Sequence, residues 1–402
     1  MENLTRRATL IGIGAAAVAA TAGLGGPAAD AATKPTIALS PSSGAPGTAV
    51  TVTGTGFPVN AAGTVACGGV SVSVGTAKNG SFTTSLAVPS TTQPSLTVSA
   101  TVGRSTASTA FTLIAAVPPV SAALPRFGVA VPGGASSSEL DAVSRLVGEA
   151  PSIVLGYYDF QQTAPIADLD AIHGRGATPL ITWEPWVAGA GVDQPAYSLA
   201  QIAGGAYDAY IRQWGAAIAS WGKPLMLRFA HEMNGNWYPW CEAVNGNKPG
   251  DYVHAWQHVH DLLAEAGTTN ITRVWGSNGG GVTDPAELYP GNGYVDAVGL
   301  DAYNWGTTQS WSIWQNPDAL FGPYLTQLRG IAPGKQLLVT ETASTEVGGS
   351  KPDWNTALIP YLLSQPDVSG FVWFDFDKET DWRIDSTSAS ATALANALAA
   401  RR

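Results

Sequence analysis

Two glutamates stand inside otherwise apolar stretches and could carry out acid–base or nucleophilic chemistry. Glu232 lies within Leu227-Arg-Phe-Ala-His-Glu-Met-Asn-Gly-Asn-Trp237, and Glu341 lies within Leu337-Leu-Val-Thr-Glu-Thr-Ala343. Two carboxyl groups that flank one bond are what hydrolysis of a glycosidic bond requires, one as proton donor and one as nucleophile or base. A buried carboxyl could instead be a structural ion-pair partner, and Arg228 shares the inward parity of Glu232. The sequence therefore offers a candidate catalytic pair, with an ion pair as the alternative for Glu232.

The elements that would position these glutamates follow from an alternation of apolar and helical stretches. Eight apolar runs are typical of buried parallel strands: Arg126–Val131, Ser152–Asp159, Thr178–Pro185, Pro224–Asn234, Ile271–Asn278, Val295–Trp305, Gln336–Ser344 and Val368–Asp377. Helical periodicity lies between most of them, over Ser137–Val147, Gly205–Trp221, Asp251–Ala266, Leu320–Arg329, Asn355–Leu363 and Ser388–Arg402. The pattern predicts an α/β fold, a (β/α)8 TIM barrel over residues 126–402. A doubly wound sheet is disfavoured because no Gly-x-Gly-x-x-Gly follows the first strand.

A barrel of this kind carries its catalytic groups at the C-terminal ends of its strands. Glu232 would end strand four and Glu341 strand seven, nearly opposite one another, so that their side chains could converge over the axis. The segment His231–Trp237 resembles the acid/base motif of glycoside hydrolase family 26, a family of retaining barrel glycosidases. The resemblance extends over the whole barrel through Trp183-Glu-Pro185, Gly299-Leu-Asp-Ala-Tyr303 and Phe371-Val-Trp-Phe-Asp-Phe-Asp377, which end strands three, six and eight.

The resemblance implies a role for each residue around the two acids. Glu232 would be the general acid/base, and Glu341 the nucleophile that forms the glycosyl-enzyme. His231 would help to set the orientation and pKa of the acid, and Tyr303 would hydrogen-bond the nucleophile and help to hold it ionised. In a retaining enzyme the two carboxyl groups lie about 5–5.5 Å apart.

Aromatic side chains after the strand ends are the predicted sugar contacts, because the apolar C–H faces of sugars pack on aromatic rings. The resemblance implies that Trp373 forms the floor of the −1 subsite and that Trp237 stacks on a neighbouring sugar. Trp186, Trp240 and Trp305 follow strand ends and are further candidates to line the cleft.

Other polar residues are interpreted as structural or supporting. Glu184 is expected to be structural or substrate-orienting rather than a third catalyst, and Asp301 to make structural hydrogen bonds rather than bind a metal. His254 and His258 are spaced as in a helical metal site but lack the intervening glutamate of zinc proteases. The sequence predicts no metal site and no cofactor.

Composition limits the classes of partner. The formal net charge is −10, which disfavours nucleic acid and anionic membrane surfaces, because both require a basic field. The two cysteines, Cys67 and Cys241, are too few for a disulfide framework or a cysteine-based zinc site. We expect a monomer whose partner is a polysaccharide.

The first 125 residues predict an export signal, a second domain and a linker. Arg6 and Arg7 precede an Ala/Gly-rich apolar stretch, which is typical of a twin-arginine signal cleaved near Ala31, with a Sec signal as the alternative. We therefore expect a secreted, extracellular protein. Residues 34–114 alternate apolar and small polar residues, which predicts an immunoglobulin-like β-sandwich that resembles IPT/TIG-type domains. Its three phenylalanines are expected in the core, which favours a spacer over a sugar-binding module, and residues 115–125 form a Pro/Ala linker.

The resemblance also implies the class of substrate. Family 26 is dominated by endo-β-1,4-mannanases, so mannan and glucomannan are the first expected substrates. Mixed-linkage β-glucan and β-1,3-xylan are the alternatives within the family. A catalytically silent carbohydrate-binding protein and a metal-dependent barrel hydrolase are the alternatives from other classes.

Overall fold

The structure is a computed structural model that describes residues 34–44, 47–89, 95–113 and 125–401. The predicted export signal and nearly all of the predicted linker lie outside the described residues. In the part of the chain that is described, no helix combines the length and the apolar character needed to cross a membrane.

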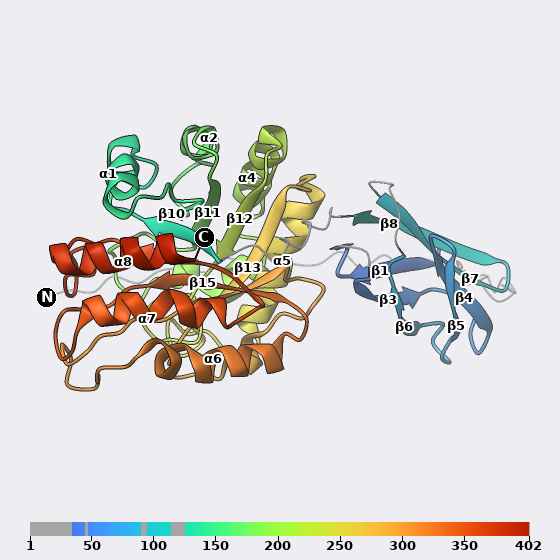
Figure 1. The fold of residues 1–402 in the computed structure, drawn as a ribbon. Helices are drawn as coiled ribbons and strands as arrows, with labels where there is room; N and C mark the ends of the chain where they lie inside the picture. The colour runs from blue at the N-terminus through green and yellow to red at the C-terminus, as the bar shows by residue number, and fades with distance from the viewer. Residues whose placement is uncertain (1–33, 45–46, 90–94, 114–124, 402) are drawn as a thin grey trace, which may run out of the picture. The chain divides into compact units, whose positions relative to one another are not determined.

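Eight parallel strands close into a barrel, as the sequence predicts (Figure 1). The strands are β9 (Arg126–Ala130), β10 (Ile153–Asp159), β11 (Thr178–Glu184), β12 (Leu225–Phe229), β13 (Ile271–Asn278), β14 (Ala297–Asp301), β15 (Gln336–Thr342) and β16 (Val368–Phe374). They pair in chain order, and β16 closes the barrel by pairing with β9. Since helices cover the barrel from outside, its strands are buried on both faces, and β14 is buried at every position.

Helices follow all but one of the strands, and they surround the barrel (Figure 1). Their bounds are α1 (Ser137–Val147), α2 (Ile166–Gly174), α3 (Leu199–Ala203), α4 (Asp208–Trp221), α5 (Asp251–Glu265), α6 (Pro317–Ile331), α7 (Lys351–Leu363) and α8 (Ser388–Ala400). Short 3-10 turns, η1 (Pro195–Tyr197) and η2 (Pro285–Leu288), complete the set, and η2 takes the place of a helix after β13. The sequence analysis missed α2 and α3, because helices this short contain too few turns to show a clear apolar stripe.

The predicted strand boundaries are accurate at the start of the strands and too long at several ends. The largest difference is in β12, which ends at Phe229 although the apolar run predicts a strand to Asn234. Ala230 and Glu232 have left-handed backbones with φ of 46° and 51°, so the chain leaves the extended conformation at this point. As a result, Glu232 lies in a turn that follows the strand, and not in the strand itself.

Residues 36–113 form two sheets that enclose a core of their own. One sheet has the order β1-β3-β6 and the other β2-β8-β7-β4-β5, with all pairs antiparallel except β2–β8. The bounds are β1 (Thr36–Ser40), β2 (Ser43–Gly44), β3 (Ala49–Thr55), β4 (Ala62–Cys67), β5 (Val70–Gly75), β6 (Phe82–Ala87), β7 (Ser95–Val102) and β8 (Ser105–Leu113). The expected burial of Phe57, Phe82 and Phe111 is confirmed. The likeness to IPT/TIG-type domains stays a prediction.

Candidate active site

Glu232 is held in the turn that follows β12. Its backbone N–H donates to the carbonyl of Gly276 on β13 at 2.9 Å, and its carbonyl accepts from Gly235 N–H at 3.0 Å. A non-glycine residue in the left-handed region costs roughly 1–2 kcal/mol. Such a conformation persists only where the surroundings impose it, and it is found preferentially at functional sites. The turn therefore fixes the direction in which the Glu232 carboxyl points.

Two side-chain donors hold the Glu232 carboxyl. Trp237 Nε1 donates to Oε2 at 2.7 Å, and Asn278 Nδ2 at the end of β13 donates to Oε1 at 2.7 Å. Burial, and then the negative charge of Glu341, raise the pKa of Glu232 to about 7 against the opposing effect of these two donors. A carboxyl with this pKa is largely protonated in mildly acidic solution and about half protonated at neutral pH, which suits a proton donor.

Glu341 lies next to the C-terminal end of β15, where the strand pairing is irregular. The register of β15 shifts against both of its neighbours near this position. Irregular pairing of this kind re-aims a side chain, and it is common beside active sites. Tyr303 Oη donates to Glu341 Oε2 at 2.5 Å, and Arg228 Nη2 donates to Oε1. Both donors stabilise negative charge on this carboxylate.

Arg228 connects Glu341 to a buried network at the centre of the barrel. Its Nη1 lies 2.6 Å from Asp301 Oδ2, and its Nε and Nη2 donate to Thr182 Oγ1 at 3.0 and 2.7 Å. Asp301 also accepts from Thr340 Oγ1 at 2.6 Å, in the structural role predicted for it. Burial alone would lower the pKa of Arg228, but the charges of Asp301 and Glu341 raise it, so the guanidinium stays charged.

The alternative of an ion pair between Arg228 and Glu232 is therefore wrong. Among the ion pairs of the described residues, those of Arg228 join Asp301 and Glu341. The parity argument fails because the backbone between Arg228 and Glu232 turns through left-handed conformations, whereas alternation of side chains holds only along a continuous strand.

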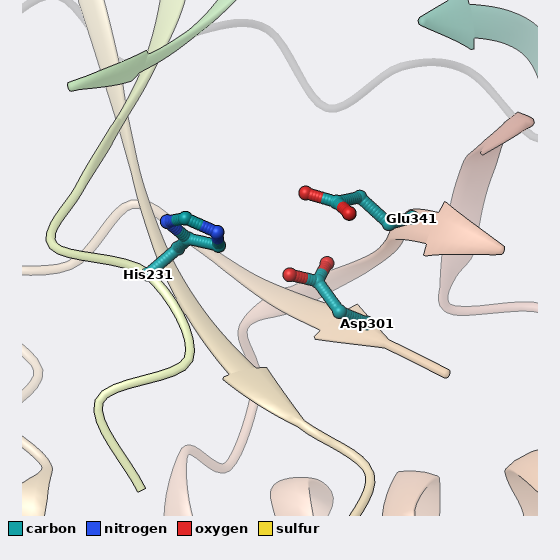
Figure 2. Close-up of side chains that lie close together, drawn as sticks. All are labelled: His231, Asp301 and Glu341. Carbon is teal, nitrogen blue, oxygen red and sulfur yellow. The ribbon is translucent and has the colours of Figure 1, made fainter. Parts of the chain in front are cut away.

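His231 lies close to Glu341 and Asp301. Figure 2 shows the side chains of His231, Asp301 and Glu341 pointing toward a common point, from the loop after β12 and from β14 and β15. Within the described chain, no hydrogen bond joins the His231 imidazole to the Glu232 carboxyl. The effect of His231 on the orientation and pKa of Glu232, which the resemblance implies, is therefore not supported by a direct contact. Burial, and then the positive charge of Arg228, hold the pKa of His231 well below its ordinary value, so the ring is neutral.

Glu184 at the end of β11 lies near His231. Its Oε1 lies 3.9 Å from His231 Nδ1, and its Oε2 accepts from Trp186 Nε1 at 3.1 Å. Burial raises the pKa of Glu184 to about 7. Its contacts join it to His231 and Trp186, and its role as structural or substrate-orienting stays a prediction.

His231, Asp301 and Glu341 are also the single group of potential metal ligands within the described ranges. One ligand atom from each lies within 4.8 Å of the others. The Arg228 guanidinium already donates to both carboxylates, and a divalent cation there would face its positive charge. The donor set therefore fits a charge-compensated cluster better than a metal site.

The positions of Trp373 and Trp240 require a correction. Both side chains have no exposed surface, so neither ring presents a face to a ligand. Trp373 Nε1 donates to the carbonyl of Trp382 at 2.9 Å, and its ring meets Trp354 of α7 at 6.1 Å. Trp240 Nε1 donates to the carbonyl of His231 at 2.6 Å. We therefore conclude that Trp373 packs between the barrel and the surrounding helices. Trp240 stabilises the turn that contains His231.

The remaining predicted aromatic contacts retain exposed surface. Trp237 is 38% exposed while its Nε1 bonds Glu232. Trp305 is half-buried, and its ring lies edge-on to Trp382 at 4.8 Å. Trp186 is half-buried and meets Tyr238 at 5.3 Å.

Several residues of the site escaped the sequence analysis. Asn278, which holds the acid, and Tyr157 of β10 are the main ones. Burial, and then the charge of Glu341, raise the pKa of Tyr157 well above its ordinary value, which places the phenol in the field of the nucleophile. Both are polar residues at or near a predicted strand end, and that signal could have identified them.

The site thus contains two buried carboxyl groups in opposite environments. One has a raised pKa and two neutral donors, and the other is paired with a guanidinium and a phenol. The two carboxyl groups therefore differ in their donors: neutral groups bond Glu232, whereas a phenol and a guanidinium bond Glu341.

Comparison with known proteins places this arrangement in a family. The sequence model of "Glycosyl hydrolase family 26" matches residues 151–358. Endoglucanase H of Acetivibrio thermocellus is 37% identical over 278 residues, which cover 66% of this chain and 29% of that protein. Beta-1,3-xylanase TXYA of a Vibrio species is 25% identical over 45% of this chain and 42% of its own length. A mannan endo-1,4-beta-mannosidase of Bacillus subtilis is 33% identical over 20% of this chain and 24% of its own length. The chain therefore spans less than half the length of these relatives.

Solved structures share the barrel. The catalytic domain of a family 26 endo-beta-1,4-mannanase from Bacillus sp. JAMB-750 superimposes with a TM-score of 0.51 and 18% sequence identity, over 69% of this chain and 85% of that one. At this identity the likeness concerns the fold alone.

Proposed function

Because the chain belongs to glycosyl hydrolase family 26, we propose that it is a retaining endo-β-glycosidase that cleaves a polysaccharide with Glu232 and Glu341. The observation that supports this proposal is the contrast between the two carboxyl groups. Glu232 has a pKa of about 7 in a buried turn, and Glu341 is bonded by Tyr303 and Arg228.

In the first step Glu232 acts as general acid. Its proton moves to the glycosidic oxygen while the bond from that oxygen to the anomeric carbon breaks. A Glu341 oxygen attacks the anomeric carbon from the opposite face and forms the glycosyl-enzyme ester. The leaving sugar departs as an alcohol, and Glu232 is left ionised, close to the donors Asn278 and Trp237, which stabilise its charge.

In the second step Glu232 acts as general base. It takes a proton from a water molecule whose oxygen attacks the anomeric carbon, and the ester bond to Glu341 breaks. Glu341 returns to the carboxylate bonded by Tyr303 and Arg228. Two inversions retain the β configuration.

For the substrate we propose a β-linked glucan first, with β-1,3-xylan and mannan as the alternatives. The match to Endoglucanase H extends over 66% of this chain, whereas the match to the Bacillus subtilis mannosidase extends over 20%. This reverses the order expected from the resemblance. Endoglucanase H is the name of a whole protein, and the matched region makes up 29% of it. The assay below therefore decides the substrate.

We also propose that the protein is exported and acts as a monomer. The predicted twin-arginine signal supports export. Both candidate catalytic carboxyl groups lie on one barrel, so the proposed mechanism requires no group from a second subunit.

Paired variants test the two catalytic assignments. With an aryl β-glycoside whose phenolate leaves without protonation, Glu232→Ala should release a burst of phenol and then stall, because no base activates water. Azide should restore turnover and give a β-glycosyl azide. Glu341→Ala should give no burst, because no ester can form. Glu287→Ala, at an exposed glutamate of η2, is the matched control and should behave as the parent. A burst and β-azide from Glu341→Ala instead would exchange the two roles.

Reducing-sugar release tests the substrate and the alternative functions. A panel of mixed-linkage glucan, mannan, glucomannan and β-1,3-xylan, each with and without a chelator, separates the candidates. Release that survives chelation supports the two-glutamate mechanism. Release abolished by the chelator supports a metal-dependent hydrolase, and binding without release supports a silent carbohydrate-binding protein.

A further inference from the structure

The segment that joins β14 to α6 carries an exposed tryptophan that the catalytic site does not use. Trp311 is 69% exposed, the most exposed of the tryptophans in the described chain, although it follows the strand that ends in Asp301. Its ring lies against Trp305 with 5.4 Å between centroids and 62° between planes. The indole is therefore held by a contact with Trp305 while most of its surface stays open to solvent.

A continuous series of rings connects Trp311 to the nucleophile. Trp305 meets Trp382 edge-on at 4.8 Å, and Trp382 meets Tyr303 at 5.1 Å. Tyr303 in turn donates its hydroxyl to Glu341. Trp311 thus lies at one end of this series of rings, which we call the aromatic wall. Tyr303, at the other end, contacts the Glu341 carboxylate.

The backbone of this segment is tied down by its own side chains. Thr308 Oγ1 donates to the carbonyl of Trp305 at 2.7 Å, and Ser312 Oγ donates to the carbonyl of Gly306 at 2.9 Å. Gln315 N–H donates to Asn304 Oδ1 at 3.0 Å, which closes the segment onto the end of β14. A ring presented by a fixed loop loses little conformational entropy on binding a ligand.

We propose that Trp311, supported by Trp305, is a sugar-stacking platform for a distal residue of the polysaccharide, beyond the sugars that flank the cleaved bond. This inference rests on the proposed glycosidase function and adds to it a binding position for long chains. The exposed indole of Trp311 offers a flat apolar surface to the C–H face of a pyranose ring. The contact with Trp305 fixes the orientation of the indole. A scattered apolar side chain on a protein surface is ordinary. Trp311 differs in its contact with the aromatic wall that leads to Glu341.

The platform has a measurable consequence for chain length. A substrate too short to reach Trp311 gains nothing from it, whereas a long chain gains affinity in both the ground state and the transition state. Loss of such uniform binding raises KM and leaves kcat nearly unchanged. An aromatic contact of about 1.4 kcal/mol corresponds to about a tenfold change.

The test measures kcat and KM for an oligosaccharide series and for a short aryl glycoside. Trp311→Ala should lower kcat/KM for the longest chains about tenfold more than for the aryl glycoside, through KM. Trp311→Phe keeps a flat ring and should recover most of the loss. Ile313→Ala is the matched control, because Ile313 belongs to the same segment and is 71% exposed, but it has no flat face.

The outcomes separate this proposal from the one on which it rests. If Trp311→Ala affects long and short substrates equally, or affects neither, the platform is refuted while the parent enzyme remains a glycosidase. If the parent enzyme cleaves no polysaccharide of the panel, the proposed function itself has failed. A length-dependent loss in Ile313→Ala equal to that in Trp311→Ala would also overturn the assignment to the indole. Thermal unfolding of each variant verifies that the fold is intact.

Discussion

Removal of the Asn278 side chain should make the enzyme active at higher pH. Asn278 Nδ2 donates to Glu232 Oε1 at 2.7 Å, and this donor stabilises the ionised acid. In Asn278→Ala the backbone stays fixed, because Asn234 Oδ1 accepts from the N–H of residue 278 at 2.9 Å and Asn234 Nδ2 donates to its carbonyl at 3.0 Å. The variant therefore changes the acid without moving the strand end.

The magnitude follows from the energy of one hydrogen bond to a charged group. Such a bond contributes about 1.5–3 kcal/mol, and one pKa unit corresponds to about 1.4 kcal/mol. Asn278 is half-buried, so water replaces part of the lost bond. We expect the pKa of Glu232 to rise from about 7 by roughly one unit. A general acid works in its protonated form, so activity is lost as pH rises through its pKa, and a higher pKa moves that loss to higher pH.

The assay is the pH dependence of kcat/KM on a polysaccharide, which reports the free enzyme. The alkaline limb should lie near pH 7 in the parent and about one unit higher in Asn278→Ala. Asn292→Ala, at an exposed asparagine whose side chain accepts from Tyr289, is the matched control and should leave the limb in place. A limb that stays near pH 7 in Asn278→Ala, or moves to lower pH, would refute the reasoning about Glu232.

Four further outcomes are expected. Trp237→Phe removes the second donor of Glu232 and should also move the alkaline limb of kcat/KM upward; a downward shift would contradict the assignment. Tyr303→Phe should lower kcat about ten- to hundredfold with the fold intact, since it removes a hydrogen bond to a charged group, and unchanged kcat would exclude the contact from catalysis. Arg228→Met leaves two buried carboxylates uncompensated and should lower the free energy of unfolding in urea by about 3–5 kcal/mol, whereas a loss below about 1 kcal/mol would count against the network. Deletion of residues 1–124 should leave turnover of soluble polysaccharide nearly intact, and a collapse of turnover in a folded truncation would show that this part shapes the cleft.

The sequence by itself determined the barrel and singled out the two glutamates as the candidate pair. Buried parallel strands are continuous apolar runs, and an acid within such a run is conspicuous, as Glu341 is in β15. The start of each strand was equally clear, because Gly, Pro and polar residues precede the apolar runs. These signals lie within short stretches of the chain, so they can be recognised without knowledge of the fold.

Only the tertiary structure decided which partner each acid has and which aromatic rings are accessible. An ion pair with Arg228 was the alternative for Glu232, but Arg228 bonds Glu341, because a left-handed turn between Arg228 and Glu232 breaks the alternation of side chains. Trp240 and Trp305 both follow predicted strand ends, yet Trp240 has no exposed surface and Trp305 is half-buried. Hydrogen-bond partners and exposure depend on contacts between segments distant in the chain, and a periodicity along one segment contains no information about them.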